Sequence, residues 1–259
     1  MIKKKLLIVY NFFLFFGLDL IRLLKSLRFI FFKYPLDLIS FYKKNQNSEN
    51  IKLFPALDDS SHNIDKIYFN QDLIVAKKIF ENRPKNHLDI GSRIDGFVAH
   101  LATFRKVYVM DIRPLKIKDE NIIFFKKDLM KNNIETKFIE NFDSVSSLHA
   151  LEHFGLGRYG DRLDPEGYIK GIKNLQRYLK KDGLFYLSLP IGFESKIFFN
   201  AHRVFTINKI LNIFSKDFKF VSLELLNELG DKIPSYDLEG NLTEISFEYG
   251  CGIFTFQKK

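Results

Sequence analysis

From about residue 71 onward, hydrophobic and polar positions alternate in blocks whose lengths suit strands and helices in turn. Short apolar runs bounded by turn residues predict strands, and longer runs with helical spacing predict helices. This alternation favours a parallel sheet with crossover helices. The pattern predicts strands over 87–90, 107–111, 122–125, 142–148, 184–189, 218–225 and 251–256, and helices over 72–82, 95–103, 165–179 and 207–214.

Seven strands in this order predict an α/β fold of the Rossmann-like, doubly wound type. We expect a mostly parallel seven-stranded sheet with helices on both faces and an antiparallel last strand. The 259 residues suit one such domain with an appendage. The α/β domain is therefore assigned to residues 51–259, and an N-terminal helical extension with its linker to residues 1–50.

The extension begins with three lysines and an apolar run from Leu6 to Leu18, and residues 19–34 follow with an amphipathic pattern. The apolar run is shorter than the ~20 residues of a spanning helix, and no small-residue cleavage site follows it. Three alternatives stay open for residues 1–34: an anchor in the membrane surface, an uncleaved spanning signal anchor, and a helix packed on the protein's own core.

The formal net charge is +9, and it is unevenly distributed. The first 50 residues hold nine lysines and arginines against three acidic residues, a local balance of +6. Basic residues beside apolar ones are typical of segments that bind anionic membranes, whereas nucleic-acid binding needs a basic patch on the folded body. We expect a membrane-surface partner, no nucleic acid, and a cytoplasmic location peripheral to a bacterial inner membrane.

A nucleotide-type site is predicted where the first strands end, because ligands of open α/β sheets bind at the carboxyl ends of the strands. Gly91 permits a tight turn after the first strand. Asp111, twenty residues later, can accept two hydrogen bonds from ribose hydroxyls, and Asp128 can accept one from an adenine amino group. Arg93 stands where a GxGxxG pattern has its second glycine.

Two further segments carry a family resemblance. FDSVSSLHALEHF (142–154) and LQRYLKKDGLFYLSLP (175–190) resemble the strand-four and strand-five signatures of class I S-adenosylmethionine-dependent methyltransferases. The matching features are Asp143, Leu151-Glu152-His153, Lys181-Asp182-Gly183 and Ser188-Leu189-Pro190. The resemblance implies S-adenosylmethionine as cofactor, bound by Asp89, Gly91, Asp111, Asp128, Ser147, Leu148 and His149.

A narrower resemblance runs from about Phe54 to Phe205. FPALDD, HLDIGS, MDIRPL, SSLHALEHFGLGRYGDRLDPEG and FNAHRVF look like a methyltransferase-like family catalogued as a domain of unknown function. Members of that family often occur among surface-polysaccharide genes. The resemblance implies a sugar or glycan acceptor, lipid-linked or anionic. It also implies O-methylation in surface-polysaccharide biosynthesis.

The glycine-rich segment 155–161 lacks the G-K-[ST] ending of a nucleoside-triphosphate loop, so we interpret it as a loop that covers the site. Polar and basic residues there and after strand five suit an anionic acceptor: Arg158, Tyr159, Arg162, Asn200 and Arg203. Methylation of a hydroxyl needs a group that takes its proton. The candidates are His153 first, then His202 and Asp161.

Two alternative functions remain. HALEH (149–153) fits the H-x-x-E-H pattern of metal-dependent hydrolases, which needs both histidines on one helical face. The altered glycine loop would also suit a non-catalytic, membrane-attached glycan-binding protein on a degenerate methyltransferase fold. We expect no metal, because the histidines lie within the methyltransferase signature.

Overall fold

The structure is a computed structural model that describes residues 2–36, 39, 65–116, 118–132, 135–198 and 201–259. The chain divides into two compact units, residues 1–63 and residues 64–259, which are described separately. The predicted boundary between residues 50 and 51 lies outside the described residues.

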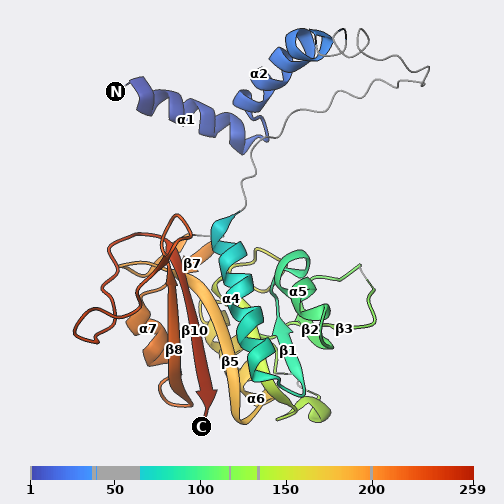
Figure 1. Cartoon of the computed structure of the whole chain (residues 1–259), viewed down its shortest axis with the longest axis vertical. Helices are drawn as coiled ribbons and strands as arrows, with labels where there is room; N and C mark the ends of the chain where they lie inside the picture. Colours follow the sequence, from blue (N-terminus) through green and yellow to red (C-terminus); the bar gives the residue numbers. More distant parts are fainter. Residues whose placement is uncertain (1, 37–38, 40–64, 117, 133–134, 199–200) are drawn as a thin grey trace. The chain divides into compact units, whose positions relative to one another are not determined.

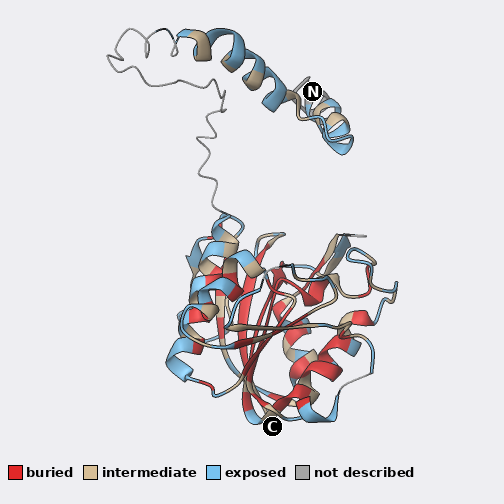
Figure 2. Ribbon diagram, turned by 90° about the vertical axis from the view of Figure 1, so that its right-hand side faces the viewer, coloured by how far each residue is buried: buried red, intermediate tan, exposed pale blue. Residues whose placement is uncertain are grey.

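The first unit consists of helices, as the sequence predicts. Helix α1 (Ile2–Phe15) is followed by α2 (Leu20–Arg28) and by a π-helix (Phe29–Lys33). The Asp19 carboxylate caps α2 by accepting a hydrogen bond from the Arg22 backbone N–H at 2.9 Å. No residue of α2 is buried, and Figure 2 shows this unit in exposed and intermediate colours. Among the helices that the structure describes, none is both long and apolar enough to cross a membrane.

The second unit is built on an eight-stranded sheet with the order β3-β2-β1-β4-β5-β10-β8-β9. The five strands from β3 to β5 are parallel, whereas β10 runs antiparallel to both β5 and β8. The strands are β1 (His87–Ile90), β2 (Val107–Asp111), β3 (Ile122–Lys126), β4 (Phe142–Leu148), β5 (Leu179–Ile191), β8 (Phe218–Leu226), β9 (Lys232–Ile233) and β10 (Gly250–Lys258).

This architecture confirms the predicted Rossmann-like α/β fold and its antiparallel last strand. The predicted count of seven strands is wrong, because β9 pairs with the end of β8 as an eighth. Two residues are too few to produce a hydrophobic pattern in the sequence. The sequence also missed a separate two-stranded hairpin of β6 (Lys196–Phe198) and β7 (His202–Val204).

Helices cover both faces of the sheet, and each face has its own apolar core. Helices α4 (Lys66–Asn82) and α5 (Ala99–Ala102), with the π-helix Ile94–Val98 before α5, pack on one face, and α4 is seen in front of the sheet in Figure 1. Helices α6 (Gly167–Tyr178) and α7 (Ile207–Phe214) pack on the other. The central strands are therefore covered on both faces, and Figure 2 shows them mostly in the colour of buried residues.

Two differences in the elements have local causes. Helix α4 begins six residues before the predicted start at residue 72, because the Asp65 carboxylate caps it by accepting from the backbone N–H groups of Ile67 and Tyr68. The predicted turn at Lys181–Gly183 is a bulge within β5. Strand β4 pairs with β5 at Leu179 and again from Leu184, so the residues between them bulge from the ladder.

Candidate functional site

The turn after β1 places backbone at the edge of a cavity. Gly91 has φ of +72°, and its N–H donates to the Met110 carbonyl at the end of β2. A Cβ at this position would lie 3.0 Å from the Cβ of Ala150. Glycine is thus favoured here both by its backbone conformation and by the close approach of the segment that follows β4.

A buried carboxylate fixes this turn to β4. Asp89 is fully buried and accepts hydrogen bonds from the Ser92 hydroxyl at 2.6 Å and the Ser146 hydroxyl at 2.7 Å. The Ser92 hydroxyl in turn accepts from the Leu148 backbone N–H at 3.0 Å. Burial raises the pKa of Asp89 to about 7, although both serines oppose this shift. The Asp89 carboxylate therefore joins the turn after β1 to β4.

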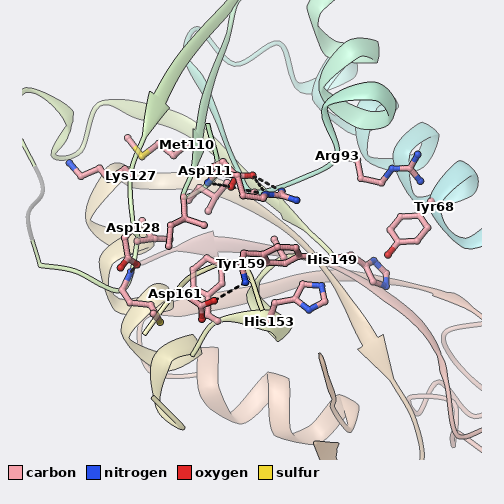
Figure 3. A pocket seen from close by; sticks show the side chains of 18 residues that line it. Tyr68, Arg93, Met110, Asp111, Lys127, Asp128, His149, His153, Tyr159 and Asp161 are labelled. Atoms are coloured by element: carbon pink, nitrogen blue, oxygen red, sulfur yellow. Dashed lines mark hydrogen bonds and ion pairs between the residues drawn. The ribbon is translucent and has the colours of Figure 1, made fainter. Parts of the chain in front are cut away.

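The cavity has a volume of about 200 Å³ and opens at the carboxyl ends of β1, β2, β3 and β4. Figure 3 shows side chains from the ends of several strands and from the loop after β4 converging on it. The structure brings seven of the predicted site residues together in its lining: Gly91, Asp111, Asp128, His149, His153, Tyr159 and Asp161.

Asp111, the carboxylate predicted to accept hydrogen bonds from ribose, forms an ion pair with Arg113. The sequence did not predict this arginine as a site residue. Asp111 Oδ2 lies 2.6 Å from the Arg113 guanidinium, and Asp111 Oδ1 accepts from Arg113 Nε at 3.0 Å. The same guanidinium lies over the Tyr159 ring, 4.6 Å from its centre. Asp111 thus faces the cavity with its two oxygens already engaged. The only sequence signal for this pair is the spacing of the two residues in MDIR.

Arg93, which replaces the second glycine of the nucleotide-binding pattern, folds along the rim. Its guanidinium pairs with Asp95 at 3.2 Å and lies 5.1 Å from the centre of the Tyr68 ring. Tyr68 comes from α4 and also lines the cavity, which the sequence reading missed because the predicted helix began too late. The long Arg93 side chain is therefore accommodated at the rim by partners of its own.

His149 forms the deep wall of the cavity. It has a positive φ of 46°, and its Nδ1 lies 2.5 Å from Gln71 Oε1. Its buried Nε2 has no hydrogen-bond partner among the described residues. Burial lowers the pKa of His149 to about 3, so the ring is neutral at physiological pH. A buried ring nitrogen without a partner is the kind of group that a polar ligand atom can satisfy.

His153 is a neutral imidazole that lines the cavity. Its Nδ1 lies 2.6 Å from the Ala201 carbonyl, which can only accept, so the neutral ring carries its proton on Nδ1 and a lone pair on Nε2. Burial lowers its pKa to about 4. Nε2 lies 3.6 Å from Oε1 of Glu152, whose pKa burial raises to about 8. The two groups are therefore both uncharged near pH 7.

The glycine-rich loop after His153 is organised by Asp161. The Asp161 carboxylate accepts backbone hydrogen bonds from Gly155 at 2.7 Å, Gly157 at 3.2 Å and Tyr159 at 3.2 Å. This arrangement holds Tyr159 over the cavity, as predicted for a covering loop. It also commits the carboxylate to three backbone donors of its own loop.

Other predicted residues lie elsewhere. Arg203 is 3% exposed and donates to the carbonyls of Glu152, Phe154 and Pro165, so its predicted substrate contact is corrected to a structural role. Ser147 and Leu148 are buried outside the lining and bond to the β1 turn. Neither Arg158, Arg162 nor His202 lines the 200 Å³ cavity, and Asn200 lies outside the described residues.

The hydrolase alternative does not match the local geometry. His149 follows the end of β4, and residues Leu151–His153 form a 3₁₀ turn, so the two histidines do not share the face of one α-helix. Within the described part of the chain, no group of three or more His, Cys, Asp and Glu side chains is placed to hold a metal ion.

Two solved structures with a similar fold are methyltransferases. The Burkholderia thailandensis 1,6-didemethyltoxoflavin-N1-methyltransferase, with bound 1,6-didemethyltoxoflavin and S-adenosylhomocysteine, is 14% identical, with a TM-score of 0.53 and 86% of each chain covered. N-methyltransferase NodS from Bradyrhizobium japonicum WM9, in complex with S-adenosylhomocysteine, is 16% identical, with a TM-score of 0.50 over 78% of this chain and 93% of its own.

These similarities and the strand order define the class: the second unit has the fold of the class I methyltransferases. Residues 101–227 match the model of the family DUF268, described as a Caenorhabditis protein of unknown function. No curated protein matches the chain. The family match spans the chain from α5 to β8 and includes His149, His153 and the loop that Asp161 organises.

The buried Glu152 carboxyl predicts a pH dependence of stability. Its pKa is raised from 4.5 to about 8, so the stabilisation is fully present below pH 4.5 and is lost as pH rises through 8. Each pH unit inside this window costs about 1.4 kcal/mol for one group. Glu152→Gln should therefore flatten the decline in unfolding free energy between pH 6.5 and 8, measured by urea denaturation at several pH values.

The matched control for this measurement is Glu166→Gln, which removes an exposed carboxylate next to α6. It should leave the wild-type slope unchanged. Parallel curves for wild type and Glu152→Gln would show that Glu152 is ionised in the folded protein.

Proposed function

We propose that this protein is an S-adenosylmethionine-dependent methyltransferase that transfers a methyl group to a hydroxyl of a polar, anionic sugar or glycan acceptor. One observation carries the proposal. The close-packed Gly91 turn, the Asp111 carboxylate after β2 and the Asp128 carboxylate after β3 line a single cavity at the carboxyl edge of the sheet.

The cavity residues fit the cofactor. Gly91 lets a ligand approach the backbone, Asp111 offers two oxygens to ribose hydroxyls, and Asp128 lies at the end of β3, where an adenine amino group would be bound. The unpartnered Nε2 of His149 offers one further polar contact. Both similar enzymes were crystallised with S-adenosylhomocysteine, which supports the same cofactor for this chain.

Ribose binding requires Arg113 to leave Asp111. In this ion pair the Arg113 side chain is 46% exposed, whereas the Asp111 side chain is 9% exposed. The guanidinium can therefore move into solvent, but the carboxylate that it leaves needs new donors, which the ribose hydroxyls would supply.

The residues near the acceptor support methylation of a hydroxyl. S-adenosylmethionine, when bound, supplies an electrophilic methyl group on sulfur. Transfer of that methyl group from sulfur to the acceptor oxygen would release the hydroxyl proton, which the Nε2 lone pair of His153 would accept. The Ala201 carbonyl keeps the opposite nitrogen protonated, and Glu152 lies beside Nε2 as a neutral positioning group.

The acceptor class rests on the sequence resemblance and on the polar residues of the covering loop. The two similar enzymes are N-methyltransferases by name, and at 14% and 16% identity they do not define the acceptor of this chain. We propose O-methylation in bacterial surface-polysaccharide biosynthesis. The sequence resemblance supports the pathway, and the neutral His153 supports a hydroxyl as the methylated group.

Asp111→Ala should weaken S-adenosylhomocysteine binding by about 1–3 kcal/mol, because it removes the acceptor for two ribose hydroxyls. Calorimetric titration measures this loss, and Asp95→Ala, which removes a carboxylate at the rim, is the control. Unchanged affinity in Asp111→Ala would contradict the assignment of the ribose site. If wild type fails to bind S-adenosylhomocysteine, the non-catalytic glycan-binding alternative replaces the enzyme.

His153→Ala should reduce turnover by roughly a hundredfold while cofactor affinity holds, because it removes the base and leaves the strand ends intact. His202→Ala is the matched control, since His202 lies outside the cavity lining. Transfer to a panel of sugar hydroxyl acceptors is the measurement. Normal turnover of His153→Ala would mean that positioning alone drives the transfer.

We further propose that residues 1–34 attach the protein to the cytoplasmic surface of an anionic membrane. Within this segment the basic residues Arg22, Lys25 and Arg28 are exposed. Large apolar side chains that are each more than half exposed accompany them: Phe12, Phe15, Phe16, Leu24, Phe31 and Phe32. Exposed aromatic side chains beside cations are typical of interfacial helices.

Replacing Phe31 and Phe32 together by serine should abolish sedimentation of the full chain with anionic lipid vesicles, because it removes exposed apolar surface. Wild-type binding should weaken with salt and be absent from neutral vesicles. Phe69→Ser, an exposed position on α4, is the control. Deletion of residues 1–34 that unfolds the remaining chain would instead support a helix packed on the protein's own core.

A further inference from the structure

A second, wider groove continues from the cofactor cavity and is strongly basic. Its volume is about 810 Å³, within the range of roughly 300–1,000 Å³ typical of small-ligand sites. The two hollows share lining residues from the ends of β2 and β3 and from the covering loop. Five cationic side chains line the groove: Arg113, Lys126, Lys127, Lys131 and Arg162.

The acidic residues of the groove do not balance this charge. Asp161 is engaged by three backbone N–H groups, and Asp128 accepts from the Met130 backbone N–H at 3.0 Å. Lys127 pairs with Glu135 and Lys131 with Asp128, each at 3.9 Å. Within the described part of the chain, Lys126 and Arg162 form no ion pair. An excess of cations in a concave site attracts anions and holds them there.

Arg113 lies where the cavity and the groove meet, because it lines both. Its partner Asp111 is also the carboxylate proposed to bind ribose. Arg113 donates four hydrogen bonds to the Asp111 carboxylate, one from its backbone N–H and three from its guanidinium. These bonds use the roughly four lone-pair sites of a carboxylate, so two ribose hydroxyls cannot bind Asp111 while the guanidinium keeps all its bonds. Ribose binding to Asp111 therefore frees the Arg113 guanidinium, which is then available to an anion in the groove.

We propose that this groove binds a diphosphate group of the acceptor, and that Arg113 couples its binding to that of the cofactor. This inference rests on the proposed function. A guanidinium binds phosphate oxygens in a bidentate manner, and the four other cations supply charge for a second phosphate. A ligand with a single carboxylate would leave most of the positive charge of the groove unbalanced. The acceptor is accordingly a diphosphate-linked sugar, whose sugar lies toward Tyr159 and His153.

The test is calorimetric titration of the full-length protein with inorganic pyrophosphate, without and with saturating S-adenosylhomocysteine. Pyrophosphate should bind about tenfold more tightly when the cofactor product is present, and it should tighten S-adenosylhomocysteine binding by the same factor. Sulfate at matched ionic strength should bind much more weakly. Equal binding of sulfate and pyrophosphate would overturn the diphosphate site in favour of general charge attraction.

Two variants test whether Arg113 couples pyrophosphate binding to cofactor binding. Arg113→Gln should bind S-adenosylhomocysteine at least as tightly as wild type, because the competitor of ribose is gone, yet it should lose the tenfold enhancement. Arg83→Gln removes the same charge from an exposed position outside both hollows and should retain the enhancement. Full enhancement in Arg113→Gln would overturn the coupling.

The same titrations separate this inference from the proposed function. Absence of S-adenosylhomocysteine binding contradicts the proposed function, and the coupling then fails with it. Cofactor binding without pyrophosphate binding overturns the groove alone. Pyrophosphate binding that Lys126→Gln and Lys131→Gln weaken, while Lys173→Gln on α6 does not, supports the groove directly. Displacement of pyrophosphate by a short RNA with higher affinity would assign the groove to nucleic acid and overturn the proposal.

Discussion

The site depends on one buried carboxylate. Asp89 joins the end of β1 to β4 through Ser92 and Ser146, and the Ser92 hydroxyl extends the link to the Leu148 backbone. Together with the Ser147 hydroxyl, which donates to the Ile90 carbonyl at 3.0 Å, these bonds hold the Gly91 turn against β4. A carboxylate buried at this depth is tolerated only because hydroxyl and N–H donors surround it. The position of every ligand-facing group at the ends of β1 and β4 follows from this network.

The cavity consequently has two kinds of wall. The wall formed by the ends of β1 and β4 is largely buried, and burial keeps its titratable groups His149 and His153 neutral. The opposite wall is half-exposed and consists of the paired Arg113 and Tyr159 with their long side chains. The buried wall suits a ligand that is always the same, such as a cofactor. The exposed wall can change partners when a ligand arrives.

The sequence was sufficient for elements whose apolar runs are bounded by turn residues. Strands over 87–90, 107–111 and 142–148 and the helix over 207–214 have the predicted bounds. The position of the site at the carboxyl ends of the strands was equally predictable, because parallel strands all end at the same edge of a sheet. Hydrogen-bond partners were not predictable in this way. Arg203 lies in a polar segment that suggests binding of the methyl acceptor. Its side chain instead donates hydrogen bonds to three backbone carbonyls of residues far away in the sequence.

The position of Asp111 shows where sequence reasoning ends and geometry begins. Its distance from Gly91 predicts a carboxylate at the end of β2, and the structure has it there. Only the folded structure reveals that Arg113 already holds both oxygens. A carboxylate with two competing partners is a switch, since satisfying one partner releases the other. Because Arg113 lines both the cavity and the basic groove, a ligand that displaced it from Asp111 would also change the charge available in the groove. The two hollows are thereby joined through one ion pair.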